Sequence, residues 1–264
     1  LIIINIARGS NLKFYIPLSI IIFSVYANIY SKEWTYVKNE KINISIIQPN
    51  ITNKLSYGKK DIILNMETLN ALTLQSLSNN PDIILWPEAP LPILYSNIKD
   101  TYYENILGVI PSSASLVSGS FSGKSNTVFN SLINITDSTN IYHKRHLVPF
   151  GEYLPYRDYF LFFYNTLGIS ILDISKGDSS HSIGINNYLA HSLICYESIF
   201  SNDSLIKNPN IDFIINVTND GWFGNSLAPI QHLNALRMRS LENQRYSVRA
   251  ANGGISAFIS PYGD

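Results

Sequence analysis

The chain has 264 residues, with 19 acidic and 19 basic side chains and a formal net charge of zero. It therefore lacks the basic field that draws proteins to nucleic acid, and no nucleic-acid partner is expected. A single cysteine, Cys195, excludes a disulfide within the chain. The length suits one large domain, or a domain with an appendage, and is enough to bury a substantial core.

The first long apolar segment, FYIPLSIIIFSVYANIY at 14–30, contains no charged residue. A membrane-spanning helix needs roughly 17–25 such residues. A buried helix is one alternative, and a signal peptide is another, although SKEW after the segment does not suit a cleavage site. Arg8 and Lys13 precede the segment, so the positive-inside tendency places the chain beyond Tyr30 on the periplasmic face. The sequence thus predicts that 1–30 is the end of a membrane domain, with one transmembrane helix at about 14–30.

From residue 41 to residue 264 the patterns of strands and helices mix along the chain. Short β-branched runs predict strands, and apolar residues three and four apart predict helices. Strands are predicted at 42–48, 81–90, 115–121, 127–136, 141–148, 188–197, 211–220 and 254–260, and helices at about 60–79 and 227–244. This mixture predicts an α/β protein with helices packed on its sheets. PYGD at the end has the composition of a turn, so the domain at 41–264 is expected to be truncated at its C-terminus.

Two motifs suggest ligands that their context does not support. SGSFSGKSN at 118–126 contains GKS, but only three residues separate Gly119 from Gly123 where a phosphate loop has four. A predicted strand also follows it instead of a helix. In HKRH, His143 and His146 lie three residues apart in a predicted strand, where they point to opposite faces. Neither a nucleotide nor a metal ion is therefore expected at these motifs.

Polar residues occur where three of the predicted strands end. Glu88 follows IILWP, Lys144 precedes the loop LVPFGEYLP, and Cys195 ends HSLIC. Glu152 closes the loop that follows Lys144. Catalytic groups gather at strand ends and on the adjoining loops, so these residues are candidates for one site.

A glutamate, a lysine and a cysteine form a coherent set for nucleophilic catalysis. A free thiol has a pKa near 8.5 and needs a base or a positive charge to become a thiolate. Glu88 could accept the proton, while Lys144 could lower the thiol pKa and hold a developing oxyanion. Taken singly, Cys195 is better explained by core packing and the other two by surface positions. Spacing alone leaves both interpretations open.

Longer motifs favour the catalytic interpretation. ILWPEAPLP, HKRHLVPFGEYLP, HSLICYESIF and NVTNDGWFG occur in the order, and at about the spacing, of the nitrilase superfamily. More narrowly, KRHLVPFGEYLP and the stretch from NDGWFG to the C-terminus resemble the apolipoprotein N-acyltransferase family. The likeness runs from about residue 14 to the end of the chain. It implies a nitrilase-like α-β-β-α sandwich whose catalytic residues are a glutamate, a lysine and a cysteine.

The resemblance implies a role for each matching position. Glu88 matches the general base, Lys144 the oxyanion lysine and Cys195 the nucleophile. The matching supporting residues of the active site are Glu152, Tyr196 and Glu197. The chain departs from the family at one position. Where the family has a lysine–tryptophan pair, this chain reads QPNITNKLSYG, with a tyrosine at the aligned position. The expected substrate or lipid contacts are Tyr57, Trp222 and Phe223.

The resemblance also implies a ping-pong reaction. Cys195 takes a fatty acyl chain from a phospholipid as a thioester, with Glu88 as the base. It then passes the chain to the N-terminal amine of a diacylglyceryl-cysteine lipoprotein. No cofactor is needed. The expected setting is a bacterial inner membrane, with the catalytic domain on the periplasmic side and the enzyme acting as a monomer.

Two other functions remain open at this point. A nitrilase-type amidohydrolase would share the three residues but use water in the second step, on a small amide or nitrile. A membrane-anchored binding module without activity would lack one of the three, whereas all are present. The aromatic segment YRDYFLFFYNTLG at 156–168 suits contact with a membrane interface, although a buried core helix has a similar composition.

Overall fold

The computed structural model describes residues 12–30, 41–54, 57–124, 127–156, 159, 173–178 and 180–264. Residue contacts divide the chain into two compact units, Leu1–Glu40 and Lys41–Asp264. The first unit contains helix α2 (Leu12–Tyr30), where the sequence predicts a helix. Within the described ranges no helix is both long and apolar enough to cross a bilayer, so the transmembrane helix predicted at about 14–30 is not found.

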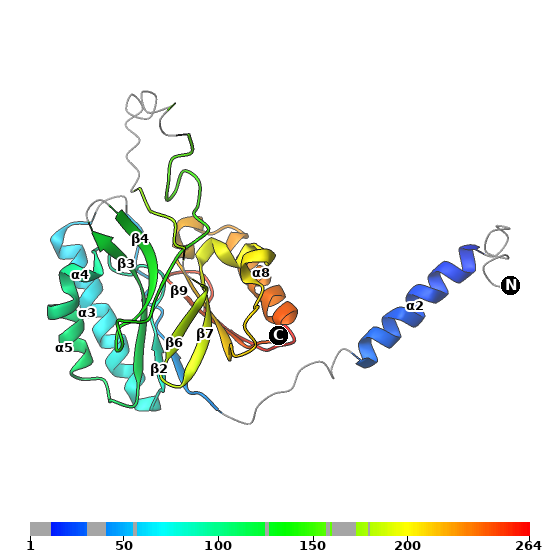
Figure 1. Cartoon of the computed structure of the whole chain (residues 1–264), viewed down its shortest axis with the longest axis horizontal. Coiled ribbons are helices and arrows are strands. Elements are labelled where there is room, and N and C mark those ends of the chain that lie inside the picture. The colour runs from blue at the N-terminus through cyan, green and yellow to red at the C-terminus, as the bar shows by residue number, and fades with distance from the viewer. Residues whose placement is uncertain are drawn as a thin grey trace. The chain divides into compact units, whose positions relative to one another are not determined.

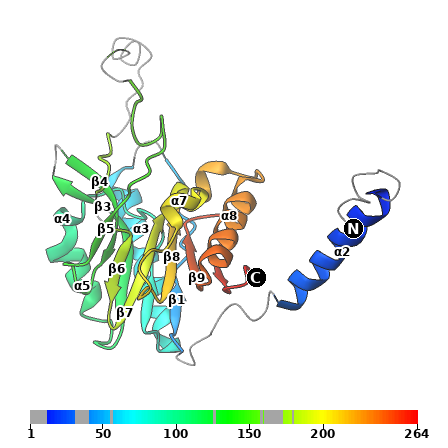
Figure 2. The same cartoon turned by 45° about the vertical axis from the view of Figure 1, so that its right-hand side comes forward.

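Two five-stranded sheets form the centre of the second unit. The first sheet contains, in spatial order, β1 (Ile44–Ile46), β2 (Ile83–Leu85), β3 (Ser115–Lys124), β4 (Thr127–Asn134) and β5 (Ile141–His143). The second contains β10 (Ala257–Ile259), β9 (Ser247–Ala251), β8 (Phe213–Thr218), β7 (Tyr188–Ile194) and β6 (Ser182–Ile185). In each sheet three parallel strands adjoin antiparallel neighbours. Figure 2 shows β7, β8 and β9 side by side.

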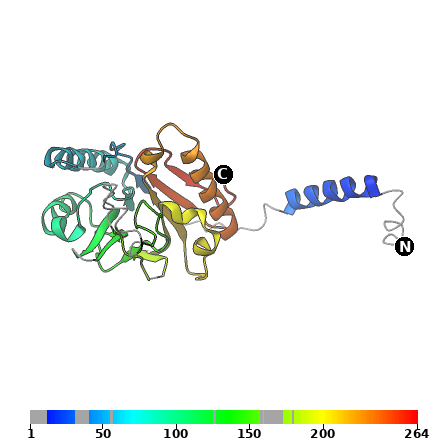
Figure 3. The ribbon, with the colours of Figure 1, turned by 90° about the horizontal axis from the view of Figure 1, so that it is seen from above.

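Helices cover the outer faces of both sheets, and short helices follow the ends of β7 and β8. They are α3 (Lys59–Ser76), η1 (Leu77–Asn79), α4 (Tyr95–Ile98), η2 (Lys99–Tyr103), α5 (Glu104–Leu107), η3 (Cys195–Ile199), α7 (Ser201–Ser204), η4 (Asp220–Phe223) and α8 (Ala228–Asn243). In Figure 1, α3, α4 and α5 lie on one side of the sheets and α8 on the other. The view from above separates the same layers (Figure 3).

Buried apolar clusters hold the four layers together. Leu132 of the first sheet and Val217 of the second belong to one cluster between the sheets. Leu69 of α3 packs in a second cluster on the outer face of the first sheet, and Leu236 of α8 packs with Ile214 of β8 in a third. Apolar burial drives this layering. The predicted α-β-β-α sandwich is confirmed.

The helix predicted at about 60–79 is found as α3 and η1. Leu69 and Thr73 are both fully buried. The indole N–H of Trp86 donates to the Thr73 hydroxyl over 3.0 Å, which joins the helix to the end of β2. Gly123 and Lys124 of the GKS motif end β3, which pairs antiparallel with β4, so the next described element is a strand and not the helix of a phosphate loop.

Most of the predicted strands end earlier than their apolar patterns indicate, and two of these differences concern Lys144 and Cys195. The strand expected at 141–148 stops at His143, so Lys144 belongs to the loop that follows. The strand expected at 188–197 stops at Ile194. Cys195 has a φ of 50°, in the left-handed region, and therefore cannot continue the strand. Both differences move a candidate catalytic residue from a strand onto a turn.

Candidate active site

Lys144 joins two glutamates in a buried ion-pair network. Its ammonium lies 2.9 Å from Glu152 Oε1 and 3.4 Å from Glu88 Oε1. Burial opposes the charge of this ammonium, but the negative charges of Glu88 and Glu152, joined by that of Cys195 when its thiol is ionised, outweigh burial and raise the pKa of Lys144. The lysine is therefore a fixed positive charge at this end of the sandwich.

Glu88 is held by hydrogen bonds from both sheets. Its Oε1 accepts the Asn130 side-chain N–H of β4 over 2.7 Å, and its Oε2 accepts the backbone N–H of Asn219, just after β8, over 2.9 Å. A glycine allows β3 to pass this closely, because a Cβ at Gly119 would lie 2.6 Å from Glu88 Cα. The Asn130 amide also donates to Glu152 Oε1 over 2.9 Å. Sequence analysis missed Asn130, because a polar residue inside an alternating strand gives no distinct signal.

Cys195 lies at a sharp turn between β7 and η3. Its positive φ is uncommon for a residue other than glycine, and such strained positions are concentrated at functional sites. The residue is partly exposed. Burial of its thiol nevertheless raises the pKa to about 12; Glu88 adds to the rise, while Lys144 and a hydrogen bond with Thr218 lower it. At neutral pH the thiol is protonated, so attack on a substrate requires a base.

Glu197 is fully buried and links the loop after β5 to η3. Its Oε1 accepts the Tyr142 hydroxyl and the backbone N–H of Arg145, each over 2.7 Å. Its Oε2 accepts the backbone N–H of Ile194 over 2.7 Å. A carboxylate that accepts this many hydrogen bonds holds the loop after β5 against η3. It therefore also holds Lys144 and Cys195, which adjoin the bonded residues Arg145 and Ile194.

Tyr196 packs beside this link. Its ring meets that of His146 edge-on, with centroids 5.8 Å apart, and that of Phe200 at 4.9 Å. The two histidines of HKRH diverge, since His146 stacks on Phe200 and His143 stacks on Phe129. Among the described residues no group of histidine, cysteine, aspartate and glutamate could hold a metal ion.

A second buried network holds the backbone of Cys195. His232 Nε2 donates to the Cys195 carbonyl over 2.9 Å, and its Nδ1 lies 2.9 Å from Asp220 Oδ1. Arg249 donates to Asp220 Oδ2 over 2.5 Å. Burial opposes the charge of Asp220, but the hydrogen bond with His232 and the guanidinium of Arg249 outweigh it and hold the Asp220 pKa below its usual range. Sequence analysis missed these residues, because three separate segments supply them.

Replacing His232 with leucine is expected to slow acylation of the candidate nucleophile Cys195 roughly tenfold, since a lost hydrogen bond to a strained backbone loosens the position of its thiol. His232→Gln keeps an N–H near the Nε2 position and should retain most of the rate. Stopped-flow or quenched single-turnover assays measure the effect. His191→Leu is the control, because His191 is also buried on β7 but makes no contact with Cys195. Equal rates in the leucine and glutamine variants would contradict the role.

The remaining sequence candidates lie at the edge of the site or apart from it. The Tyr57 hydroxyl donates to the Thr52 carbonyl and accepts the Lys54 N–H, so its hydrogen bonds are local. Trp222 and Phe223 lie in η4, 60% and 44% exposed, directly after the loop that binds Glu88. The aromatic segment 156–168 lies outside the described residues except for two exposed tyrosines, at 156 and 159.

Comparison with known proteins identifies the family. A family model described as carbon-nitrogen hydrolase matches residues 43–264. The chain belongs to the carbon-nitrogen hydrolase family. Among solved structures, a CN-hydrolase superfamily protein from Xanthomonas campestris, with an arsenic adduct in its active site, has a similar fold: the TM-score is 0.58 at 17% identity, over 85% of this chain and 84% of that one.

Curated relatives show a more specific similarity within this family. The chain is 34% identical, over 96% of its length, to an apolipoprotein N-acyltransferase from Wigglesworthia glossinidia brevipalpis, and 30% identical, over 88%, to one from Methylococcus capsulatus. The matches cover 52% and 46% of those proteins. This carbon-nitrogen hydrolase therefore spans about half the length of the curated relatives it matches. The resemblance inferred from the motifs is confirmed, while the catalytic roles of individual residues stay predictions.

Proposed function

We propose that the chain carries the catalytic domain of an N-acyltransferase, which moves a fatty acyl chain from a phospholipid to the N-terminal amine of a diacylglyceryl-cysteine lipoprotein. The arrangement of Glu88 and Lys144 around the thiol of Cys195 carries the proposal, because both charges act on that thiol. The names of the curated relatives support the choice of donor and acceptor. No cofactor takes part.

In the first half-reaction the thiol attacks the ester carbonyl of the phospholipid. Glu88 accepts the thiol proton as the sulfur–carbon bond forms, and the carbonyl electrons move to oxygen. Lys144, together with the backbone N–H of Tyr196, stabilises this oxyanion. The ester C–O bond then breaks, Glu88 returns the proton to the leaving alkoxide, and a lysophospholipid departs. A thioester remains on Cys195.

In the second half-reaction the lipoprotein amine attacks the thioester. Glu88 accepts a proton from the attacking nitrogen, and Lys144 again stabilises the oxyanion. The C–S bond breaks as the amide forms, and the sulfur regains its proton from Glu88. The free enzyme is restored, so the same two charged groups serve both steps.

We place this reaction at the surface of a bacterial inner membrane, on its periplasmic side. The described side chains of α2 support lipid contact, since large apolar residues are exposed on every side of the helix. These are Tyr15, Ile16, Leu18, Ile20, Ile21, Ile22, Phe23, Val25 and Tyr26. Exposed Trp222 and Phe223 support a second lipid contact beside the catalytic residues.

Mass spectrometry of the intact chain after incubation with phospholipid micelles tests the proposal. We expect a mass increase of one acyl group on Cys195, which disappears when a diacylglyceryl-cysteine peptide is added and appears as an amide on that peptide. A small-amide hydrolase would instead leave the phospholipid untouched and release ammonia from an amide substrate. That result, or an acyl group lost only to water, would overturn the transferase assignment.

A further inference from the structure

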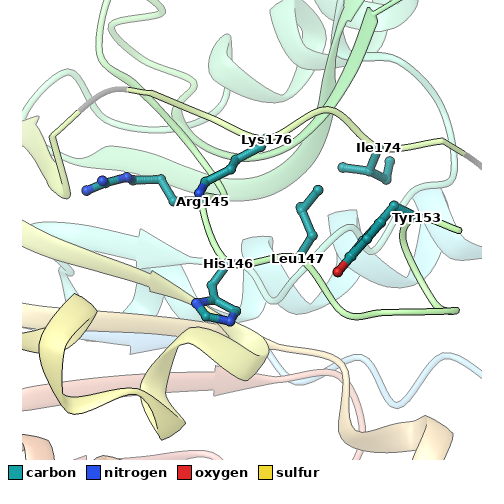
Figure 4. Close-up of a pocket in the computed structure, with 6 residues that line it drawn as sticks. All are labelled: Arg145, His146, Leu147, Tyr153, Ile174 and Lys176. Carbon is teal, nitrogen blue, oxygen red and sulfur yellow. The ribbon is translucent and has the colours of Figure 1, made fainter. Parts of the chain in front are cut away.

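A cavity of about 400 Å³ lies beside the loop that follows Lys144. Its lining residues are Arg145, His146, Leu147, Tyr153, Ile174 and Lys176. Figure 4 shows the cavity with the basic side chains on the left and Leu147, Ile174 and Tyr153 on the right. One end is therefore basic and the other apolar.

Two cationic residues are brought together at the basic end by backbone contact. The N–H of Gly177 donates to the Lys144 carbonyl over 2.8 Å, which sets Lys176 beside Arg145. A side chain at Gly177 would collide with His143, so glycine permits this approach. Two like charges held side by side repel each other unless an anion lies between them.

Two acidic residues near this end, Glu197 and Asp203, are already occupied. Glu197 accepts the backbone N–H groups of Arg145 and Ile194, and Asp203 pairs with His146 at 2.8 Å. In the part of the chain that the structure describes, neither Arg145 nor Lys176 forms an ion pair. The Nε of Arg145 is buried and has no hydrogen-bond partner among these residues. A buried guanidinium nitrogen without an acceptor is costly, so the site favours an anionic ligand.

The cavity adjoins the catalytic residues. Its basic end begins one residue after Lys144, and its His146 ring meets Tyr196, which directly follows Cys195. At the apolar end, Ile174 is bonded through its backbone N–H to the carbonyl of Glu152 over 2.8 Å. A ligand in the cavity would thus lie between the loop that carries Lys144 and Glu152 and the segment that carries Ile174 and Lys176.

We infer that this cavity binds the phosphate group of the acyl donor, with Arg145 and Lys176 as its ligands and the apolar end receiving the adjoining hydrocarbon. The inference rests on the proposed function, which supplies a phospholipid as the donor. An arginine fork and a lysine ammonium suit the tetrahedral oxygens of a phosphodiester. Binding of the phosphate there holds the donor equally in the ground state and the transition state, without joining the chemical steps.

The double variant Arg145→Gln/Lys176→Gln tests the inference. Acylation of the Cys195 thiol is measured with two donors: dipalmitoyl phosphatidylglycerol in micelles, and p-nitrophenyl palmitate, which has no phosphate. We expect the KM for the phospholipid to rise roughly tenfold to a hundredfold with kcat unchanged, because charge-assisted hydrogen bonds are lost. Kinetics with the nitrophenyl ester should stay as in the parent chain.

Lys207→Gln, at an exposed position, controls for the change in net charge. Inhibition of the parent chain by inorganic phosphate would show that the cavity takes the free anion, whereas inhibition only by glycerophosphoglycerol would show that it needs the diester; the double variant should lose either effect. An unchanged phospholipid KM, or an equal loss with both donors, would overturn the inference. Failure of the parent chain itself to accept the phospholipid would instead overturn the proposed function.

Discussion

Cys195→Ser is expected to abolish the acyl-enzyme. A serine hydroxyl is a much weaker acid than a thiol, and burial already raises the thiol pKa to about 12, so Glu88 could not activate the replacement at a useful rate. The rate of acyl transfer should fall by a factor of roughly 10³ or more, as when a nucleophile is removed from a group of residues that act together. The measurement is single-turnover transfer from phospholipid, followed by mass spectrometry.

The Cys195→Ser substitution should lower the reaction rate without changing the fold. Serine is close to cysteine in size, and the turn conformation at φ 50° is equally open to it, so the melting temperature should change little. Ser192→Ala on the same strand is the matched control, since its buried hydroxyl has no partner in the described structure. Acyl transfer at the parent rate in Cys195→Ser, with a normal fold, would contradict the thioester mechanism.

Local patterns in the sequence predicted helices packed on sheets and the strand-end residues, whereas the four-layer sandwich was implied by the family resemblance. A run of apolar residues that ends in a polar one marks the place where a strand leaves the core, and Glu88 and Lys144 are such positions. The sequence also predicted the helix that contains α3, in which Leu69 and Thr73 are buried and repeat with the helical period. The transmembrane prediction also came from composition alone, and no helix of the described chain meets its requirements.

The features that could not be predicted from the sequence depend on contacts between segments that lie far apart in the chain. SVRAA forms β9 in the middle of a sheet, although Arg249 interrupts its apolar pattern. Burial of that arginine is acceptable because Asp220 neutralises it, and Asp220 comes from a loop 29 residues earlier. Asn130 likewise gains its significance from Glu88 and Glu152, which lie in loops after other strands. Such partners cannot be identified from a single sequence, because they come together only when the strands pair in the folded protein.

Glu88→Gln is expected to block both half-reactions, because the amide cannot accept the proton of the thiol or of the amine. General-base catalysis contributes typically 10²–10⁴-fold, so acylation should fall by about that factor. The thiol of Cys195 should nevertheless ionise more readily in this variant. After burial, the Glu88 charge is the strongest cause that raises the thiol pKa, and its removal leaves Lys144 to favour the thiolate.

Alkylation by iodoacetamide across pH separates these two effects. In Glu88→Gln the midpoint for alkylation of Cys195 should shift to lower pH, even though acyl transfer falls. Glu152→Gln is the matched control: Glu152 shares Lys144 and Asn130 with Glu88, but its charge is not among the causes that shift the Cys195 pKa. Its midpoint should therefore move less. A more reactive thiol that no longer transfers acyl chains would identify Glu88 as the base, whereas an unshifted midpoint with acyl transfer intact would assign that role to another residue.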